Sequence, residues 1–351
     1  MKIAFVPVYE NNPYQKELIK SIVSFENDVI KADTGAKAFF ETPGIKDVDV
    51  IHFHWIDAFF TGNNIILVFI KSLIFLIRLV LFKKNKTYVW TVHNLVGHDS
   101  KFPKLEKFMC RLFLRMMDGI SVHNQYSIDR LVSDYKVKKY KVFLIPHGNY
   151  INAYPNVNTS KLKEVIDQFK FPTESRVIMF LGQIRPYKGV EILIDSFLAA
   201  EVKDTKLLIC GNIKDKTYES ALIKRIDNHS DIVLSNHFVS DDDLSSYFEL
   251  ADVVVFPYKN ILTSGALILA MSFKKVCLVS NTGSLPELVG STFVFETQND
   301  LTLKIKDVAK MTKSDLATFG EANYNNIYTN TWDEMGRLTT EMYKKVKNKL
   351  R

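Results

Sequence analysis

The sequence predicts an α/β protein with two doubly wound domains, each built on a parallel sheet with helices on both faces, and a cleft between them. Short apolar runs alternate with segments of helical period along the chain, which is the pattern of β-α-β units. The alternation runs twice, and a stretch rich in Asn, Pro and Tyr at 147–160 separates the two passes. The 351 residues suffice for two domains of ordinary size.

In the first half, apolar runs rich in Val, Ile and aromatic residues predict strands at 2–8, 47–55, 87–94, 118–123 and 142–146. Helical periodicity predicts helices near 13–24, 64–82, 101–117 and 124–135. We therefore assign 1–150 to an N-terminal domain and 151–172 to a linker.

In the second half, the predicted strands are 176–182, 205–211, 231–235, 251–257 and 276–280, and the predicted helices lie near 188–200, 215–229, 240–250 and 264–273. The C-terminal domain is expected at 173–330. The tail from 299 is helical and polar, and 331–351 is expected to form a final helix.

The composition is that of a globular protein, with 47% apolar and 24% charged residues. The apolar run at the N-terminus is too short for a signal peptide. Three cysteines, Cys110, Cys210 and Cys277, lie far apart in apolar segments, without zinc-ligand spacing. We expect buried free thiols and a cytoplasmic protein.

Positive charge is concentrated in the first half. The net charge is +7, but 1–172 contain 24 Lys/Arg and 16 Asp/Glu, whereas 173–351 contain 22 and 23. The first half is therefore expected to face a phosphorylated lipid or an anionic membrane surface. We expect no nucleic acid partner, because RNP, zinc-finger and basic-helix patterns are missing from the sequence.

The segment from Asn64 contains 18 nearly apolar residues, which is the length of a membrane span. However, Asn64, Lys71, Arg78 and Asn85 recur every seven positions, and predicted strands of one sheet flank the segment. We therefore expect a helix packed on the sheet, with part of its apolar face exposed to lipid. The alternative is complete burial.

Two segments of the second half suit a bound diphosphate, although the sequence has neither a P-loop nor a GxGxxG motif. In "FLGQIRPYKG", Gly182 ends a strand, and Arg185 and Lys188 follow it. In "ILTSGALILAMSF", Thr263, Ser264 and Gly265 lie at a predicted helix start, where N–H groups bind anions. The alternatives are a solvated loop and a simple N-cap.

Polar side chains also follow other predicted strands. In the first half, His52 and His54 of "HFHW" lie on the same side of a predicted strand, with Trp55 beyond them. In "WTVHNLVGHDS", His93 and Asn94 end a predicted strand, and His98 and Asp99 follow in the loop. Several histidines at one sheet edge indicate a functional role for at least one, and the missing acidic or Cys partners at ligand spacing argue against a metal. In the second half, Gly283 follows a strand end, and Glu287 either favours the helix dipole or lines the cleft.

The motifs "LGQIRPYKG" and "VVVFPYKNILTSGALILAMSFKKVCLVSNTGSLPELVG", after a first domain closed by "IPHGN", resemble a GT-B fold glycosyltransferase close to family 4. "WTVHNLVGHD" and "FHW" are similar to bacterial exopolysaccharide and surface-glycan members. The resemblance covers the whole chain and is strongest over 177–290.

This resemblance implies a hexosyltransferase with two Rossmann-like domains facing across a cleft. The C-terminal domain would hold a UDP-, GDP- or dTDP-sugar, with no metal or other cofactor. The N-terminal domain would hold a lipid-linked or oligosaccharide acceptor, and would contact the inner face of the plasma membrane in a cytoplasmic, peripheral protein. The last helix would return to the first domain after Trp332.

The sequence departs from the family at three positions. Gln183 stands where the family has arginine, and Arg185 is expected to replace it. Alignment on "SFKKVCLVS" places Ile261 and Leu269 at the positions of the two family glutamates, so the resemblance leaves the sugar and the stereochemistry open.

An inverting reaction would need a general base, for which His98 or Asp99 is expected, followed by Asp57. In a retaining reaction, His93 would contact the donor sugar. The alternative functions are a nucleotide-sugar epimerase of the same fold, a catalytically inactive partner subunit, and a two-lobed solute-binding protein. The missing export signal argues against the last of these.

Overall fold

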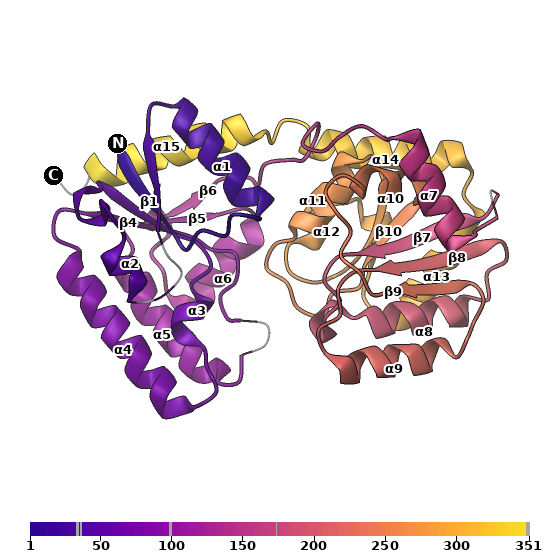
Figure 1. Cartoon of the computed structure of the whole chain (residues 1–351), viewed down its shortest axis with the longest axis horizontal. Helices are drawn as coiled ribbons and strands as arrows, with labels where there is room; N and C mark the ends of the chain where they lie inside the picture. The colour runs from indigo at the N-terminus through magenta and orange to yellow at the C-terminus, as the bar shows by residue number, and fades with distance from the viewer. Residues whose placement is uncertain (33–34, 36, 98–99, 173, 349–351) are drawn as a thin grey trace. The chain divides into compact units, whose positions relative to one another are not determined.

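The computed structural model describes residues 1–32, 35, 37–97, 100–172 and 174–348. The chain divides into two compact units: unit 1 comprises 1–148 and 330–351, and unit 2 comprises 149–329. Each unit contains a six-stranded sheet with helices on both of its faces (Figure 1). This confirms the predicted α/β class with two doubly wound folds.

The sheet of unit 1 has the strand order β2-β1-β3-β4-β5-β6, and its neighbouring strands pair in parallel. The strands are β1 (Lys2–Val6), β2 (Asp28–Lys31), β3 (Val50–Phe53), β4 (Thr87–Thr91), β5 (Gly119–Val122) and β6 (Val142–Leu144). Residues of β3, β4 and β5 are buried throughout, which explains their nearly continuous apolar sequences.

Helices cover both faces of this sheet, with α1 and α15 on one face and α3, α4 and α5 on the other (Figure 1). The helices are α1 (Pro13–Ser24), α2 (Ala38–Glu41), α3 (Asp57–Phe60), α4 (Ile65–Phe82), α5 (Pro103–Met116), α6 (Gln125–Tyr135) and α15 (Trp332–Asn348). Local sequence explains several helix starts. Asn12 caps α1 ahead of Pro13, and Asn64 accepts hydrogen bonds from the first N–H groups of α4.

The last helix, α15, completes the core of unit 1 by packing along α1. Its side chains Met335, Met342, Tyr343 and Val346 join residues of β1 and β3 in one buried cluster. The two helices approach closely because α15 has a glycine at the contact: a Cβ at Gly336 would lie 2.0 Å from Ser21 Oγ. The fold of the first 148 residues therefore includes a segment from the other end of the chain.

The sheet of unit 2 has the order β12-β11-β10-β7-β8-β9, again with parallel neighbours. The strands are β7 (Arg176–Leu181), β8 (Thr205–Cys210), β9 (Ile232–Ser235), β10 (Val253–Phe256), β11 (Val276–Ser280) and β12 (Val294–Phe295). The helices are α7 (Thr159–Phe169), α8 (Val190–Ala200), α9 (Lys216–Ile226), α10 (Leu244–Leu250), α11 (Gly265–Ser272), α12 (Leu285–Leu288), α13 (Gln298–Lys310) and α14 (Lys313–Ile327). In Figure 1, α7, α10 and α14 lie on one face, and α8, α9 and α13 on the other.

Two strands, β2 and β12, and three helices, α2, α3 and α7, were not predicted. The strands β2 and β12 are short and lie at sheet edges, where half-exposed residues weaken the apolar pattern. Helix α7 lies inside 151–172, which we had assigned to a linker. Asn158 caps this helix, and its buried residues Val165 and Phe169 share one face of it. Cys110, Cys210 and Cys277 are free and buried, as predicted.

We expect Gly336→Val to lower the free energy of unfolding of unit 1 by about 2 kcal/mol, because the new side chain must displace α15 from Ser21. Urea unfolding measures this loss. Gly290→Ala is the control, since a Cβ at Gly290 has no atom within 4 Å. An unchanged unfolding midpoint in Gly336→Val would contradict the close contact between α1 and α15.

Candidate active site

A tight loop after β7 holds the two cations that the sequence predicted. Gly182 and Gly189 have φ values of +137° and +65°, which favour glycine. A Cβ at Gly189 would lie 2.1 Å from the carbonyl oxygen of Pro257, so the loop packs directly on the end of β10. Between the glycines, Pro186–Lys188 form a 3₁₀ turn, and α8 begins immediately after them.

The ammonium group of Lys188 folds back over this loop. Its Nζ would lie 3.3 Å from a Cβ built on Gly182, and it is 5.3 Å from the ring centroid of Tyr258. Within the described ranges, this ammonium forms no hydrogen bond or ion pair. Desolvation, followed by repulsion from Arg185, lowers the pKa of Lys188 to about 8. A partly buried cation of this kind is suited to an anionic ligand.

The neighbouring cation Lys259 is already neutralised. It pairs with Glu191 in the first turn of α8, and Glu191 also accepts a hydrogen bond from the Tyr218 hydroxyl. Burial raises the pKa of Glu191, but the hydrogen bonds from Lys259 and Tyr218 outweigh burial and hold it below its usual value. This network could not be predicted from the sequence, because its members come from α8, α9 and the loop after β10. The contrast identifies Lys188, rather than Lys259, as the cation available to a ligand.

The start of α11 lies near the same point. Ser264 is buried and caps the helix, its Oγ accepting from the Leu267 N–H at 3.2 Å. The first backbone bond of the helix runs from Ile268 to Ser264, so the N–H groups of Gly265 and Ala266 precede the helical ladder. Thr263 is half-buried beside them. Ser264 is thus an N-cap, as the simpler interpretation held, and the helix start still presents N–H groups.

Tyr258 connects this helix start with Lys188. Burial raises the pKa of Tyr258, Tyr187 adds to the rise, and the neighbouring Ser264 side chain opposes it. Because Lys188 lies over the Tyr258 ring, the structure brings Gly182, Lys188 and the start of α11 to one end of the unit 2 sheet. Parallel α/β sheets bind ligands at this end.

The loop after β11 packs against the segment that precedes α11. Gly283 has a φ of +61°, and a Cβ there would lie 1.9 Å from the carbonyl oxygen of Ile261. Glu287 is exposed on α12, in the position of a first-turn acid. Ile261 is buried and Leu269 half-buried, so apolar side chains occupy both positions at which the resemblance implied glutamates.

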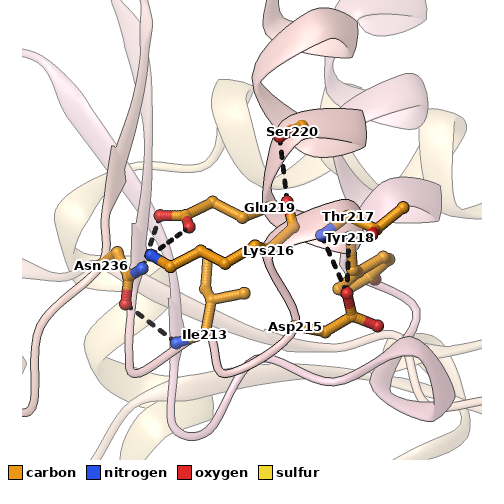
Figure 2. A network of polar contacts seen from close by, with 8 residues as sticks. All are labelled: Ile213, Asp215, Lys216, Thr217, Tyr218, Glu219, Ser220 and Asn236. Atoms are coloured by element: carbon orange, nitrogen blue, oxygen red, sulfur yellow. Dashed lines mark hydrogen bonds and ion pairs between the residues drawn. The ribbon is translucent and has the colours of Figure 1, made fainter.

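A polar network fixes the loops after β8 and β9 (Figure 2). Asn236 accepts from the Ile213 N–H at 2.9 Å and donates to Glu219. Glu219 also pairs with Lys216 at 2.8 Å, and Asp215 caps the start of α9. The network holds two further strand ends at the same edge of the sheet.

In unit 1, five buried histidines gather where the central strands end. They are His52, His54, His93, His123 and His147, and the last two were not predicted. His54 Nδ1 lies 3.2 Å from His93 Nε2. His93 stacks on Trp55 with ring centroids 4.1 Å apart, and the ring of Tyr14 contacts all of them except His52.

These histidines are neutral in the folded protein. Burial is the main cause that lowers the pKa to about 3 in His52 and His147 and to about 4 in His123. Burial and the neighbouring histidines bring His54 and His93 well below the usual value. The structure thus places His93 as a neutral group that exchanges hydrogen bonds rather than as a cation. Among the described residues, no group of three or more His, Cys, Asp or Glu is arranged to hold a metal.

Acid should therefore destabilise unit 1. Unfolded histidines titrate near pH 6.5, so below this pH the unfolded chain binds protons that the folded unit excludes. For each histidine, stability falls by about 1.4 kcal/mol per pH unit down to its folded pKa. Urea unfolding at about pH 7.5, 6 and 5 measures this slope.

The control is His229→Gln, at an exposed histidine of unit 2, which should leave the slope unchanged. His123→Gln should reduce the slope by the contribution of one histidine, about 1.4 kcal/mol per pH unit. The variant should still fold, because Gln retains hydrogen-bonding groups toward Tyr14 and the carbonyl oxygen of Ile145. Equal stability of the wild type at about pH 7.5 and 5 would contradict the burial of neutral histidines.

A small cavity after β3 and β4 is lined by Asp57, Asn94, Gly97 and Glu106. Glu106 Oε1 accepts from the Gly97 N–H at 2.6 Å, and burial raises the pKa of both carboxyl groups. Asp57, predicted as the second choice for a base, therefore lies beside an acid that the sequence did not reveal. The first choices, His98 and Asp99, lie outside the described residues.

Comparison with known proteins gives a consistent result. Residues 163–325 match the family "Glycosyl transferases group 1". A "GDP-mannose:glycolipid 4-beta-D-mannosyltransferase" of Xanthomonas campestris pv. campestris is 24% identical over 251 residues, which cover 70% of this chain and 66% of the relative. The alignment thus spans just under two thirds of that curated relative.

Solved structures extend the similarity to nearly the whole chain. Anabaena HepE in complex with UDP and glucose superposes with a TM-score of 0.75 at 16% identity, covering 98% of this chain and all of that one. Sucrose-phosphate synthase from Thermosynechococcus elongatus superposes with a TM-score of 0.77 at 14% identity, covering 98% of each chain. The chain therefore has the GT-B glycosyltransferase fold, and its residues 163–325 carry the sequence pattern of the group 1 glycosyltransferases.

Proposed function

We propose that the protein is a hexosyltransferase that moves a sugar from a nucleoside diphosphate donor to an acceptor hydroxyl. The observation that carries this proposal is the ammonium of Lys188, partly buried near the start of α11 without a hydrogen bond or ion pair in the described chain. Lys259 has a carboxylate partner nearby, so Lys188 is the lysine that remains available to a ligand.

The chemistry follows from where charge develops. As the bond between sugar and phosphate breaks, the departing diphosphate gains negative charge. Arg185, Lys188 and the N–H groups at the start of α11 would stabilise that charge. We infer that these groups serve in place of a metal ion, with Thr263 and Ser264 as hydroxyl donors. Glu287 is retained as a candidate contact to the donor.

The donor and the acceptor are proposed by class. The name of the Xanthomonas relative specifies GDP-mannose and a glycolipid, and HepE was crystallised with UDP and glucose. We propose a UDP-, GDP- or dTDP-sugar donor and a lipid-linked or oligosaccharide acceptor in surface polysaccharide synthesis. His98, Asp99 and Asp57 remain the candidate bases, and neutral His93 is a candidate hydrogen-bonding partner of a sugar.

The two alternatives are less well supported. An epimerase of the same fold would act on the donor alone, whereas the family matched by 163–325 is a transferase family. An inactive partner subunit would need no free cation at the end of β7, yet Lys188 is kept without a carboxylate partner in the described chain.

We expect Lys188→Ala and Arg185→Ala each to lower kcat by about 10²- to 10³-fold, the effect of removing one transition-state donor. The assay incubates UDP-, GDP- and dTDP-sugars with and without membrane lipid extract and follows sugar into lipid. Lys163→Ala, at an exposed lysine of α7, is the matched control. Undiminished turnover in Lys188→Ala would remove the diphosphate assignment, and epimerised donor without acceptor would favour the epimerase.

The affinity for a nucleoside diphosphate should fall as the pH rises. The ammonium of Lys188 binds the diphosphate, and in the free protein its pKa is about 8. Above that pH, the dissociation constant should therefore rise by up to about tenfold per pH unit. Lys188→Arg should abolish this dependence, because arginine stays protonated. Calorimetric titration with UDP and GDP tests it, and a flat wild-type profile across this range would contradict the role of Lys188.

A further inference from the structure

We propose that α4, together with the outward face of α5, binds an anionic lipid bilayer, with α4 lying parallel to the membrane plane. We call this the α4–α5 surface, and define it by Ile65–Phe82 of α4 and by Lys104, Phe108, Arg111 and Arg115 of α5. This inference goes beyond sugar transfer, and it stands on observations that do not involve the diphosphate site.

Helix α4 is apolar on both sides. One side packs on unit 1 through its buried residues Val68, Ser72, Phe75, Leu76 and Leu79. The other side exposes ten large apolar side chains: Ile65, Ile66, Leu67, Phe69, Ile70, Leu73, Ile74, Ile77, Val80 and Leu81. Their exposed fractions run from 39% for Leu73 to 76% for Leu81. A helix that covers a sheet needs one apolar stripe, so the second stripe indicates another apolar partner.

The only two charged residues of α4 are bound back onto the protein. Lys71 Nζ donates to the carbonyl oxygens of Ala58 at 3.1 Å and Thr61 at 2.9 Å. The Arg78 guanidinium lies 4.2 Å from the ring centroid of Phe40. The exposed stripe is therefore left without charge over the whole length of the helix, as a surface that enters the acyl region requires.

The charge next to α4 is strongly positive. The sequence from 64 to 117 contains ten Lys/Arg and two Asp/Glu, a net charge of +8, which equals the whole excess of 1–172. On α5, which packs beside α4 (Figure 1), Lys104, Phe108, Arg111 and Arg115 are exposed at helical spacing on one face. Lys84 is exposed directly after α4. An apolar stripe bordered by cations matches the acyl chains and headgroups of an anionic membrane.

The strand pairing excludes a membrane span by this helix. Among the described residues, α4 alone is long and apolar enough to cross a bilayer. However, it connects β3 to β4, which pair in parallel, with His52 opposite Val89. Phe75 and Leu79 are fully buried against the unit. Crossing the bilayer would break these contacts and separate paired strands, so α4 lies in the membrane–water interface.

The charge also favours lipid over a second copy of the chain. A symmetric dimer through the α4–α5 surface would bring the exposed cations Lys104, Arg111 and Arg115 of two copies together, and this repulsion opposes association. Anionic headgroups complement the same charge, each cation near the surface strengthening membrane partition about fivefold.

Vesicle co-sedimentation with the full chain tests the proposal. We expect the protein to sediment with mixed phosphatidylglycerol–phosphatidylethanolamine vesicles, to remain soluble with phosphatidylcholine vesicles, and to be released by high salt and by alkaline carbonate. Ile70→Glu/Ile77→Glu should reduce binding at least tenfold, because two charges enter the apolar stripe. Lys104→Ser/Arg115→Ser should reduce it by about 25-fold, at about fivefold per cation.

Two control variants carry the same changes elsewhere. Val23→Glu/Ile223→Glu adds two charges at side chains of similar exposure on α1 and α9, and Lys163→Ser/Lys203→Ser removes two exposed cations. Both should bind vesicles like the wild type. All variants should keep the wild-type thermal unfolding transition and affinity for UDP or GDP, which separates this surface from the diphosphate site.

Four results would overturn the proposal. They are wild-type binding to neither vesicle, equal binding to both, unaltered binding by Ile70→Glu/Ile77→Glu, and retention in the membrane after carbonate. A wild-type dimer in sedimentation velocity that Ile70→Glu/Ile77→Glu dissociates, without vesicle binding, would assign the surface to a second copy instead.

Discussion

Parallel strand pairing is the constraint on which both units depend. In each sheet the neighbouring strands run in the same direction, so each connection must return along a face of the sheet, and most of these connections contain a helix. The same geometry collects every carboxyl end at one edge. In unit 2, the loop 182–189 and the start of α11 follow strands in the sequence, and the parallel order makes them neighbours in space. The histidines of unit 1 gather in the same way at the edge of their own sheet.

At the carboxyl edge of the unit 2 sheet, close backbone packing determines where the charge of Lys188 lies. Gly189 lets the loop after β7 lie against the carbonyl oxygen of Pro257, and the loop then carries Lys188 over Tyr258. Lys259 instead pairs with Glu191. Of these two neighbouring lysines, one is therefore neutralised by a carboxylate, and the other has no carboxylate partner in the described chain. The resulting arrangement has the properties of a site that binds phosphate through side chains and a helix start.

Unit 1 illustrates how much a buried polar cluster depends on distant segments. Tyr343 of α15 bonds to His52, and Tyr14 of α1 bonds to His123. Both helices lie on one face of the sheet, whereas α4 lies on the other and keeps an exposed apolar side. The two faces thus differ: one completes a core that contains neutral histidines, and the other carries the apolar stripe for which we propose a membrane partner.

From the sequence we could predict the α/β class, the two doubly wound units, most strands and helices, the buried thiols, and the loops that carry Arg185, Lys188 and Ser264. These features follow from local periodicity, turn residues and capping residues, all of which depend on residues close together in the sequence. The short edge strands β2 and β12 and helix α7 were missed, because their patterns are brief or lie in polar surroundings.

Other features are visible only in the folded chain. The fold shows which lysine is neutralised, and it brings His123 and His147 into the histidine cluster. It also places Glu106 beside Asp57, and turns Lys71 and Arg78 away from the exposed stripe of α4. Each of these facts depends on contacts between residues far apart in the chain. The protonation and exposure of a side chain are set by such contacts, and they leave no local pattern in the sequence.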